Sequence, residues 1–249
     1  MNENYRVTIA HAVGSETGGT TGKPGDQTGK EVRIQEWYIS GDAWDGVLRA
    51  KDAAARLLIA QNAETGARNP QLGYSQKERF TAFDVVKSFG YNYNALNKDA
   101  STDCSQMATT CANFAGYPIP RDTYSGNMKD RYLATGSFKL LNGKKYRKDY
   151  KDLLPGDILF RAEHHAAMVI NNIYWLKSSL SRSNSSGRKA DVKALQTRLN
   201  EINGAGLEVD GAFGPKTEQA VKNLQYNNGI ESSGVVDRET ALVLGFVFA

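Results

Sequence analysis

The stretch that decides the fold is residues 103–120, DCSQMATTCANFAGYPIP, which follows Thr102. Thr102 and Asp103 are residue types that cap helix N-termini, and the small and apolar residues after them recur at helical spacing. The sequence therefore predicts a helix that begins at Cys104. A cysteine in the first turn of a helix faces unpaired backbone N–H groups and the positive end of the helix dipole, and both favour the thiolate.

Cys104 has two interpretations from the residues alone. A single cysteine is most often a small buried hydrophobic residue, but at this position it is also suited to be a nucleophile. Cys111 lies seven residues later, about two turns along the same helical face, so no disulfide can join the two. We interpret Cys111 as a core residue and Cys104 as the reactive one.

The chain has three histidines, and two of them, His164 and His165, are adjacent. They lie between two predicted buried strands, residues 158–160 (ILF) and residues 165–170 (HAAMVI). A neutral imidazole there could take the proton of a thiol and later protonate a leaving amine. Successive strand residues point to opposite faces, so only one of the pair can face the cysteine. The residues leave open which one, and whether both are ordinary surface residues.

A glycine-rich loop over residues 14–32 follows an alternating segment over residues 5–12. The loop is long for an ordinary connection, so it is either a mobile surface loop or a functional one. Gln27 near its end could donate an amide N–H to an oxyanion, and Glu31 lies close by. Aromatic side chains beside polar groups often line grooves for extended ligands. We expect substrate contacts from the three aromatic residues that follow: Trp37, Tyr38 and Trp44.

Composition excludes several classes of protein. The chain has 249 residues, of which 40% are hydrophobic and 23% charged, with a net charge of +4. No dense Lys/Arg run is present, so nucleic acid is a poor partner, whereas a polyanionic bacterial wall is compatible with the charge. We expect no signal peptide and no membrane insertion, because no apolar run approaches the ~18 residues of a span. Three histidines without ligand spacing are a poor metal site, so we expect no metal or other cofactor.

Two helical patterns, residues 43–63 and residues 75–89, are expected to be scaffold helices. The second begins with Ser75 and has Glu78 three residues later, which is the pattern of a capping box. The basic region after residue 120 predicts a short hairpin around residues 142–143 (Asn-Gly).

The composition changes at residues 178–188 (SSLSRSNSSGR), which predicts a flexible serine-rich linker. Residues 189–249 then show three helical patterns separated by turns, a bundle near the lower size limit for an independent core. The turn at residues 210–215 (DGAFGP) lacks the alternating carboxylates of a calcium loop, so we expect no metal there.

The order of the motifs resembles the NlpC-type cell-wall cysteine peptidases. The matching motifs are DCS at a helix start, then PIPR, then PGDILF, then a histidine leading an apolar strand, within residues 100–172. The resemblance implies a papain-like core, in which the cysteine helix packs on a small antiparallel sheet that bears the histidine. It implies Cys104 as nucleophile, His165 as base with His164 as its neighbour, and Asp103 as the residue that caps the helix and orients the site.

The NlpC-type family normally adds a third polar residue on the strand after the histidine strand. Here Asn171 or Asn172 could serve, although neither sits at the usual place, and Asp26, Gln27 or Glu31 of the N-terminal loop are alternatives. That loop also looks like the opening of phage-encoded lysins. The DGAFGP turn resembles the three-helix peptidoglycan-binding modules, which implies wall contacts from Asp210 and Phe213.

Together these features predict an α+β papain-like hydrolase domain over residues 1–177, the linker, and an all-α wall-binding domain. We expect a monomeric phage endolysin, made in the host cytoplasm, which reaches the wall on release and cleaves an amide of the stem peptide through a thioester. The resemblance favours the D-γ-glutamyl–diamino acid bond, with the muramoyl–L-Ala bond or the crosslink as alternatives. A non-catalytic wall-binding protein and an acyltransferase of the same fold are the rival classes.

Overall fold

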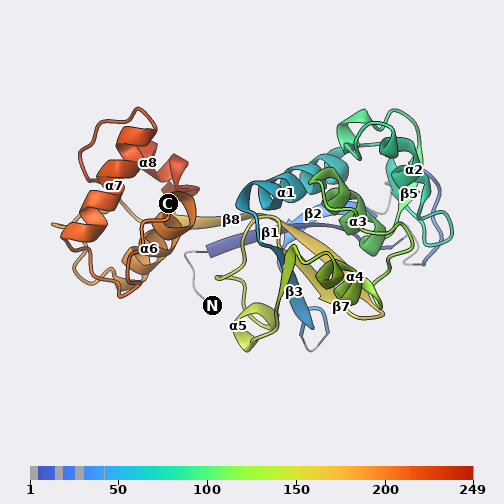
Figure 1. Cartoon of the computed structure of the whole chain (residues 1–249), viewed down its shortest axis with the longest axis horizontal. Coiled ribbons are helices and arrows are strands. Elements are labelled where there is room, and N and C mark those ends of the chain that lie inside the picture. Colours follow the sequence, from blue (N-terminus) through green and yellow to red (C-terminus); the bar gives the residue numbers. More distant parts are fainter. Residues whose placement is uncertain (1–4, 15–18, 26–30, 42, 249) are drawn as a thin grey trace. The chain divides into compact units, whose positions relative to one another are not determined.

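The computed structural model describes residues 5–14, 19–25, 31–41 and 43–248. They form two compact units, one built on residues 7–172 and the other on residues 173–248 with the first residues of the N-terminal strand. Figure 1 follows the chain through both units by colour. The first unit mixes helices with a sheet and the second is mainly helical, which confirms the coarse architecture that the sequence predicts.

The larger unit is organised around one sheet with the strand order β2-β1-β8-β7-β3-β6. The strand pairs with a defined register in this unit's sheet are antiparallel. The order places β1, from the start of the described chain, beside β8, from the end of the unit. The strands are β1 (Tyr5–Ala12), β2 (Val32–Glu36), β3 (Gly46–Ala50), β6 (Phe138–Leu141), β7 (Ile158–Arg161) and β8 (His165–Leu176).

Strand β8 is buried on both faces of the sheet. Ala166 and Met168 pack in the cluster that includes helices α1 (Ala53–Arg68) and α3 (Cys104–Phe114). Those two helices pack against each other over the sheet (Figure 1). Ala167 packs in a second cluster on the opposite face. Alternate side chains serve the two clusters, which explains why the strand reads as a continuous apolar run.

The predicted helix over residues 43–63 is wrong in its first part. Residues 46–50 form the central strand β3, which pairs with both β6 and β7. Helix α1 begins only at Ala53, where the Asp52 side chain accepts a hydrogen bond from the Ala55 N–H at 2.7 Å. Pairing on both edges of β3 outweighs the helical periodicity of the segment, because local propensity is a weak guide against tertiary contacts.

The predicted helix over residues 75–89 is shorter than expected. Ser75 Oγ does accept a hydrogen bond from the Glu78 N–H at 3.2 Å, but this contact closes a turn that precedes the helix. Helix α2 covers only Thr81–Lys87. Gly90 follows it with φ at +65°, a conformation that glycine adopts without strain.

The hairpin predicted around residues 142–143 is wrong. Strand β6 ends at Leu141, and the chain enters a short helix, α5 (Lys144–Arg147). The sheet partner of β6 is β3, nearly ninety residues earlier in the chain, rather than a following strand. A turn-favouring Asn-Gly pair does not create a hairpin here, because the residues that follow it form α5 instead of a strand.

The described part of the glycine-rich loop is anchored to a second, two-stranded parallel sheet, β4 (Leu72–Tyr74) with β5 (Ala100–Thr102). Gln76 N–H donates to the Thr20 carbonyl at 2.8 Å, and Gly25 N–H donates to the carbonyl of Ala100 at 3.2 Å. Residues 19–25 are therefore held beside the strand that leads into α3. The unit also contains 3₁₀ helix η1 (Tyr93–Ala95) and helix α4 (Met128–Ala134).

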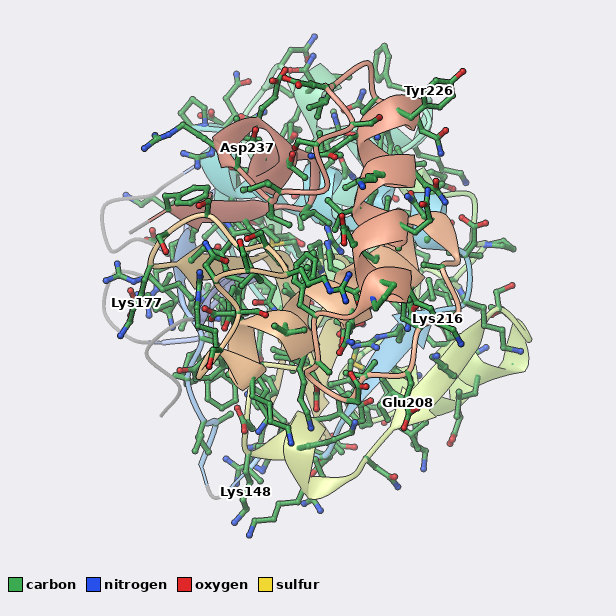
Figure 2. All side chains as sticks on the ribbon, turned by 90° about the vertical axis from the view of Figure 1, so that its left-hand side faces the viewer. Lys148, Lys177, Glu208, Lys216, Tyr226 and Asp237 are labelled. Atoms are coloured by element: carbon green, nitrogen blue, oxygen red, sulfur yellow. The ribbon has the colours of Figure 1, made fainter. Side chains whose placement is uncertain are left out.

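The C-terminal unit contains the three helices that the sequence predicts, α6 (Lys189–Asn203), α7 (Pro215–Asn227) and α8 (Arg238–Val243). The short strand β9 (Phe246–Phe248) pairs in parallel with the last residues of β8. Figure 2 shows α7 running from near Lys216 to near Tyr226, whose side chain projects away from the ribbon. The buried core of this unit is aliphatic and aromatic, and includes Leu195, Leu199, Val221, Leu224 and Leu244.

A buried glutamine of α6 organises the turn before α7, which we call the Gln196 turn (residues 210–217). Gln196 Nε2 donates to Asp210 Oδ1 at 2.7 Å and to the Ala212 carbonyl at 3.1 Å, while Gly211 N–H donates to Gln196 Oε1 at 2.9 Å. Gly211 has φ at +82°, and a Cβ there would lie 2.5 Å from a Lys189 side-chain carbon. The turn therefore requires glycine.

The next helix repeats the arrangement in the Gln225 turn (residues 233–240). Gln225 Nε2 donates to the Val235 carbonyl at 2.8 Å and to Thr240 Oγ1 at 2.9 Å. Gly234 N–H donates to Gln225 Oε1 at 2.9 Å. The sequence repeat of turn and capped helix thus corresponds to a repeated hydrogen-bonding unit.

The segment predicted as a flexible linker, residues 178–188, packs within the C-terminal unit. Leu180 is fully buried and exchanges backbone hydrogen bonds with Val236 at 3.0 and 2.8 Å. Arg188 Nη1 donates to the Ser179 carbonyl at 2.6 Å. The division between the units falls after residue 172, earlier than the expected boundary at 177. One apolar anchor and several side-chain hydrogen bonds suffice to order a serine-rich segment.

Candidate functional site

Helix α3 begins at Cys104, as predicted, and Asp103 caps it. The Asp103 carboxylate accepts hydrogen bonds from Gln106 N–H at 2.7 Å and from Ser105 Oγ at 2.8 Å. Its second oxygen accepts from Arg79 Nη1 at 2.9 Å. Both carboxylate oxygens are thus engaged within the protein, and the start of the helix is fixed from three sides.

The Cys104 side chain is only 8% exposed. Burial, followed by the Asp103 carboxylate, raises the pKa of the thiol to about 12. Backbone N–H groups of Ala166, Ser105 and Cys104 itself point at the sulfur and oppose the rise. The expected preference of a helix N-terminus for thiolate is therefore outweighed by desolvation. The contact with Ala166 also places the sulfur at the start of β8, next to the residue that follows His165.

His165 pairs with the third histidine of the chain, which the sequence did not single out. Nε2 of His165 lies 2.8 Å from Nδ1 of His11, across 154 residues of sequence. The two ring centroids are 5.0 Å apart. His11 belongs to β1, the neighbour of β8 in the sheet, and its side chain is fully buried. A histidine on an alternating strand was the available signal, but the strand order needed to use it is not local.

Both imidazoles of this pair are held neutral. Burial, followed by His165 and the Arg33 guanidinium, lowers the pKa of His11 to about 3, and the Gln35 side chain opposes this shift. Burial, followed by Arg33, lowers the pKa of His165 to about 4. Both rings are therefore uncharged at neutral pH, with one proton lying between the two facing nitrogens.

Trp44, one of the three aromatic residues expected to contact substrate, is fully buried. Its indole ring lies 5.9 Å from the His165 ring, and its Nε1 donates to the Tyr38 carbonyl at 2.8 Å. The Tyr38 ring packs 5.8 Å from His11. Trp37, which is partly buried, packs against Tyr150 with ring centroids 5.2 Å apart. Trp44 and Tyr38 thus form an aromatic wall around the histidine pair.

Asn171 cannot orient the His165 imidazole. It belongs to the same strand, six residues further on, and at about 3.3 Å per residue this places it roughly 20 Å away. Its neighbour Asn172 donates to the Leu153 carbonyl at 2.5 Å. The ring nitrogen that a third residue would engage is instead occupied by His11.

Two further predicted auxiliary residues, His164 and Glu31, lie in the described part of the chain. His164 is exposed, and its N–H donates to the Arg161 carbonyl at 3.1 Å. Glu31 is buried where β2 begins, and its carbonyl accepts from Val13 N–H at 2.7 Å. Gln27 and Asp26 lie outside the described residues.

Tyr74 is a second residue that sequence reasoning missed. Burial raises the pKa of its phenol to about 12, and the Cys104 and Asp103 side chains contribute to the rise. Its hydroxyl accepts a hydrogen bond from Gln76 Nε2 at 3.1 Å. The phenol therefore lies near the thiol, contributed by β4 rather than by α3 or β8.

Asp210 and Phe213, the expected wall contacts, support the C-terminal fold. Asp210 Oδ1 accepts from Gln196 and from Ala212 N–H at 2.8 Å. Phe213 is 6% exposed and belongs to the core of the unit. The large aromatic side chain that this unit does expose is Tyr226, at 79%. A direct contact of Asp210 with the wall stays a prediction.

The described residues bring together no three His, Cys, Asp or Glu side chains that could hold a metal ion. Both cysteines carry free thiols. In the part of the chain that the structure describes, no helix is both long and apolar enough to span a bilayer.

Comparison with known families assigns both parts of the chain. Residues 9–173 match the endolysin-like domain, and residues 188–244 match a peptidoglycan binding domain. No curated protein matches the chain, and no solved structure matches it. The first match contains Cys104, His165 and His11, and covers well over half of the sequence. The chain therefore belongs to the endolysin-like domain family and carries a peptidoglycan-binding domain behind it.

Proposed function

We propose that the chain is a peptidoglycan hydrolase in which Cys104 attacks an amide carbonyl of the stem peptide and His165 serves as its base. What supports this is the backbone N–H of Ala166, the residue after His165 on β8, which hydrogen-bonds the thiol, together with the 2.8 Å contact between Nε2 of His165 and Nδ1 of His11. With Nε2 of His165 engaged, Nδ1 is the nitrogen left for the thiol. The endolysin-like family match supports hydrolysis of the cell wall.

The pKa values favour proton transfer during attack over a preformed ion pair. The thiol pKa is raised to about 12 and the pKa of His165 is lowered to about 4, so both groups rest in their neutral forms. As the S–C bond forms, the thiol proton passes to Nδ1 of His165 and the carbonyl becomes a tetrahedral oxyanion. The donor proposed for that oxyanion is the Cys104 backbone N–H at the helix start.

Collapse of the tetrahedral intermediate breaks the C–N bond and leaves a thioester on Cys104. The imidazolium of His165 gives its proton to the leaving amine. A water molecule then loses a proton to the same imidazole and attacks the thioester, which releases the carboxylate and restores the thiol. His11 holds the ring throughout, and Trp44 packs beside it.

The peptidoglycan-binding domain supports peptidoglycan as the partner. Its contribution to the proposed function is local concentration at an insoluble polymer, which requires no residue of the catalytic site. A monomer with two complementary units suffices for this scheme.

Within this function we propose cleavage between D-γ-glutamate and the following diamino acid, as the resemblance to NlpC-type peptidases favours. Cleavage of the muramoyl–L-Ala bond or of the crosslink are the alternatives. Mass spectrometry of muropeptides released from purified walls distinguishes the three by the new termini, because each bond yields a different free amine. The wild type is expected to release fragments and Cys104→Ala none.

The matched control is Cys111→Ala, which removes the other thiol from the core of the same helix. It is expected to release the same fragments as the wild type. Release by Cys104→Ala at the wild-type rate would exclude the thiol mechanism.

One observation favours a rival function, that of a non-catalytic wall-binding protein: the Cys104 thiol is almost fully buried, with a strongly raised pKa. This rival predicts that the protein sediments with purified walls while no new amine appears. The mass-spectrometric experiment therefore decides between the two, provided that wall binding is measured on the same samples.

A further inference from the structure

The histidine pair is flanked by a second polar pair on β2, Arg33 and Gln35. In the antiparallel register of β1 and β2, Arg33 lies opposite His11, and Gln35 is two residues further on the same face. Arg33 Nε donates to Gln35 Oε1 at 2.7 Å. Guanidinium groups only donate hydrogen bonds, so this contact fixes the amide of Gln35 with its oxygen toward Arg33.

The outer nitrogen of His11 faces this amide. Nε2 of His11 is buried and, among the described residues, has no hydrogen-bond partner in good geometry. The Gln35 side chain nevertheless acts on the His11 ring, since it raises the pKa of His11 against the effect of burial. Hydrogen bonds of catalytic groups are often long or misaligned without substrate. Gln35 Oε1 is thus the acceptor available to an Nε2–H of His11.

The proposed chemistry requires one particular tautomer of His165. As a base toward Cys104 it needs an unprotonated Nδ1, so its proton must sit on Nε2 and point at His11. His11 must then accept on Nδ1 and carry its own proton on Nε2, facing Gln35. The opposite direction of the His11–His165 bond would place a proton on Nδ1 of His165 and leave it unable to take one from the thiol.

We propose that Arg33 and Gln35 are positioning residues that set the tautomer of His165 through His11. This inference rests on the proposed function, since it concerns the base of that reaction. No bond is made or broken at Arg33, Gln35 or His11, and each proton that moves in the reaction is taken up or given by Nδ1 of His165. Arg33 orients the amide of Gln35, the amide oxygen holds Nε2–H of His11, and His11 receives Nε2–H of His165.

The three histidines make a direct experiment possible. Nitrogen NMR of protein labelled with ¹⁵N-histidine distinguishes protonated from unprotonated ring nitrogens, and the exposed His164 provides an internal reference. At neutral pH we expect both His11 and His165 as Nε2–H tautomers. A wild-type His165 that carries its proton on Nδ1 overturns the proposal, and this reading needs no variant.

Three variants of β2 complete the experiment. Gln35→Leu removes the acceptor and is expected to leave His11 and His165 as a mixture of both tautomers. Gln35→Glu keeps an acceptor oxygen for Arg33 and for His11 and is expected to restore the single tautomer. The control Glu36→Gln changes an exposed neighbour that points away from the pair and should leave the spectrum unchanged. If Gln35→Leu keeps both wild-type tautomers, the proposal is wrong.

Kinetics on a soluble stem peptide give the functional counterpart. Gln35→Leu should lower kcat on the order of tenfold, part of the 10²–10⁴-fold that general base catalysis contributes, while KM stays constant and Gln35→Glu recovers most of the loss. An increase in KM with an unchanged kcat would assign Gln35 to substrate binding and contradict the inference. The NMR reading does not depend on activity, so an inactive protein with fixed tautomers would refute the proposed function and leave the inference standing.

Discussion

The Gln196 turn and the His11–His165 pair differ in how fully their buried polar atoms are hydrogen-bonded. At the Gln196 turn the amide oxygen and nitrogen are both engaged, and the partners lie within about twenty residues of one another. At the histidine pair the partners are 154 residues apart, and Nε2 of His11 is buried without a well-placed partner among the described residues. Satisfied local networks stabilise a fold, whereas incompletely satisfied buried groups are found where a protein performs chemistry.

The largest effect is expected from breaking the satisfied network. Gln196→Leu would remove hydrogen bonds to Asp210, Ala212 and Gly211 and leave buried polar groups unpaired. We expect a loss of about 3 kcal/mol in the free energy of unfolding of the C-terminal unit. Denaturant unfolding followed by wall sedimentation measures both stability and binding.

Gln219 is the matched control, because its side chain is exposed and donates a hydrogen bond to Asn223 within α7. Gln219→Leu should change the free energy of unfolding by less than about 0.5 kcal/mol. Equal effects of the two substitutions would show that the buried glutamine has no special structural role.

A somewhat smaller effect is expected from breaking the long-range pair. His11→Ala would free Nε2 of His165, and we expect kcat on a soluble stem peptide to fall about 100-fold, within the range of general base contributions. His11→Asn offers an amide oxygen to the same nitrogen and should recover part of the activity. An unaltered kcat in a folded His11→Ala protein would remove His11 from the mechanism.

The lowered pKa values predict an unusual acid limit. His165 titrates near 4 in the folded protein, below the ordinary value of 6.5, so the neutral base should persist and kcat/KM should fall only as the pH approaches 4. Arg33 contributes to this lowering, and Arg33→Met should move the limit to higher pH. A pH profile with an unchanged limit in the variant would contradict this electrostatic effect.

The same pKa values carry a stability consequence. Between pH 6.5 and about 4 the unfolded chain takes up protons at His11 and His165 that the folded chain does not. The free energy of unfolding therefore decreases as the pH falls through that window. Replacing both histidines with glutamine should make the thermal unfolding midpoint depend less on pH between pH 6.5 and about 4.

The smallest effect is expected on the surface of the C-terminal unit. Tyr226→Ala removes the exposed ring at the end of α7 (Figure 2) and should weaken wall binding by a few-fold, as loss of one stacking contact would. The unfolding transition should not change, because the ring packs against little. If Tyr226→Ala sediments with walls as strongly as the wild type does, another face of the unit contacts the wall. Leu242, which is 67% exposed, is then the next candidate.

The comparison also separates what the sequence could predict from what it could not. The start of α3 and its Asp103 cap were predictable, because capping depends on neighbouring residues. The repeated turns before α7 and α8 were visible for the same reason. Strand β3 was mistaken for helix, because its pairing with β6 and β7 involves residues about ninety and more than a hundred positions away.

The partner of His165 was sought at Asn171 or Asn172 and in the N-terminal loop, but not on β1. Asn171 and Asn172 follow His165, as the family pattern suggested, yet the strand beside β8 that carries the partner is β1. Periodicity identified residues 5–12 as an alternating segment but gave no information about its neighbour in the sheet. The order of the strands in the sheet was needed to identify His11, and it cannot be predicted from composition or motif spacing.

The position of β1 has a consequence for anyone who recombines lysin modules. A chimaera whose hydrolase part starts after residue 12 would retain Cys104, His165 and most of the sheet, yet it would lack His11. Such a protein could fold, expose β8 as a new sheet edge and show weak lysis for reasons unrelated to its cell-wall target. Any domain exchange should therefore keep strand β1 together with the endolysin-like domain.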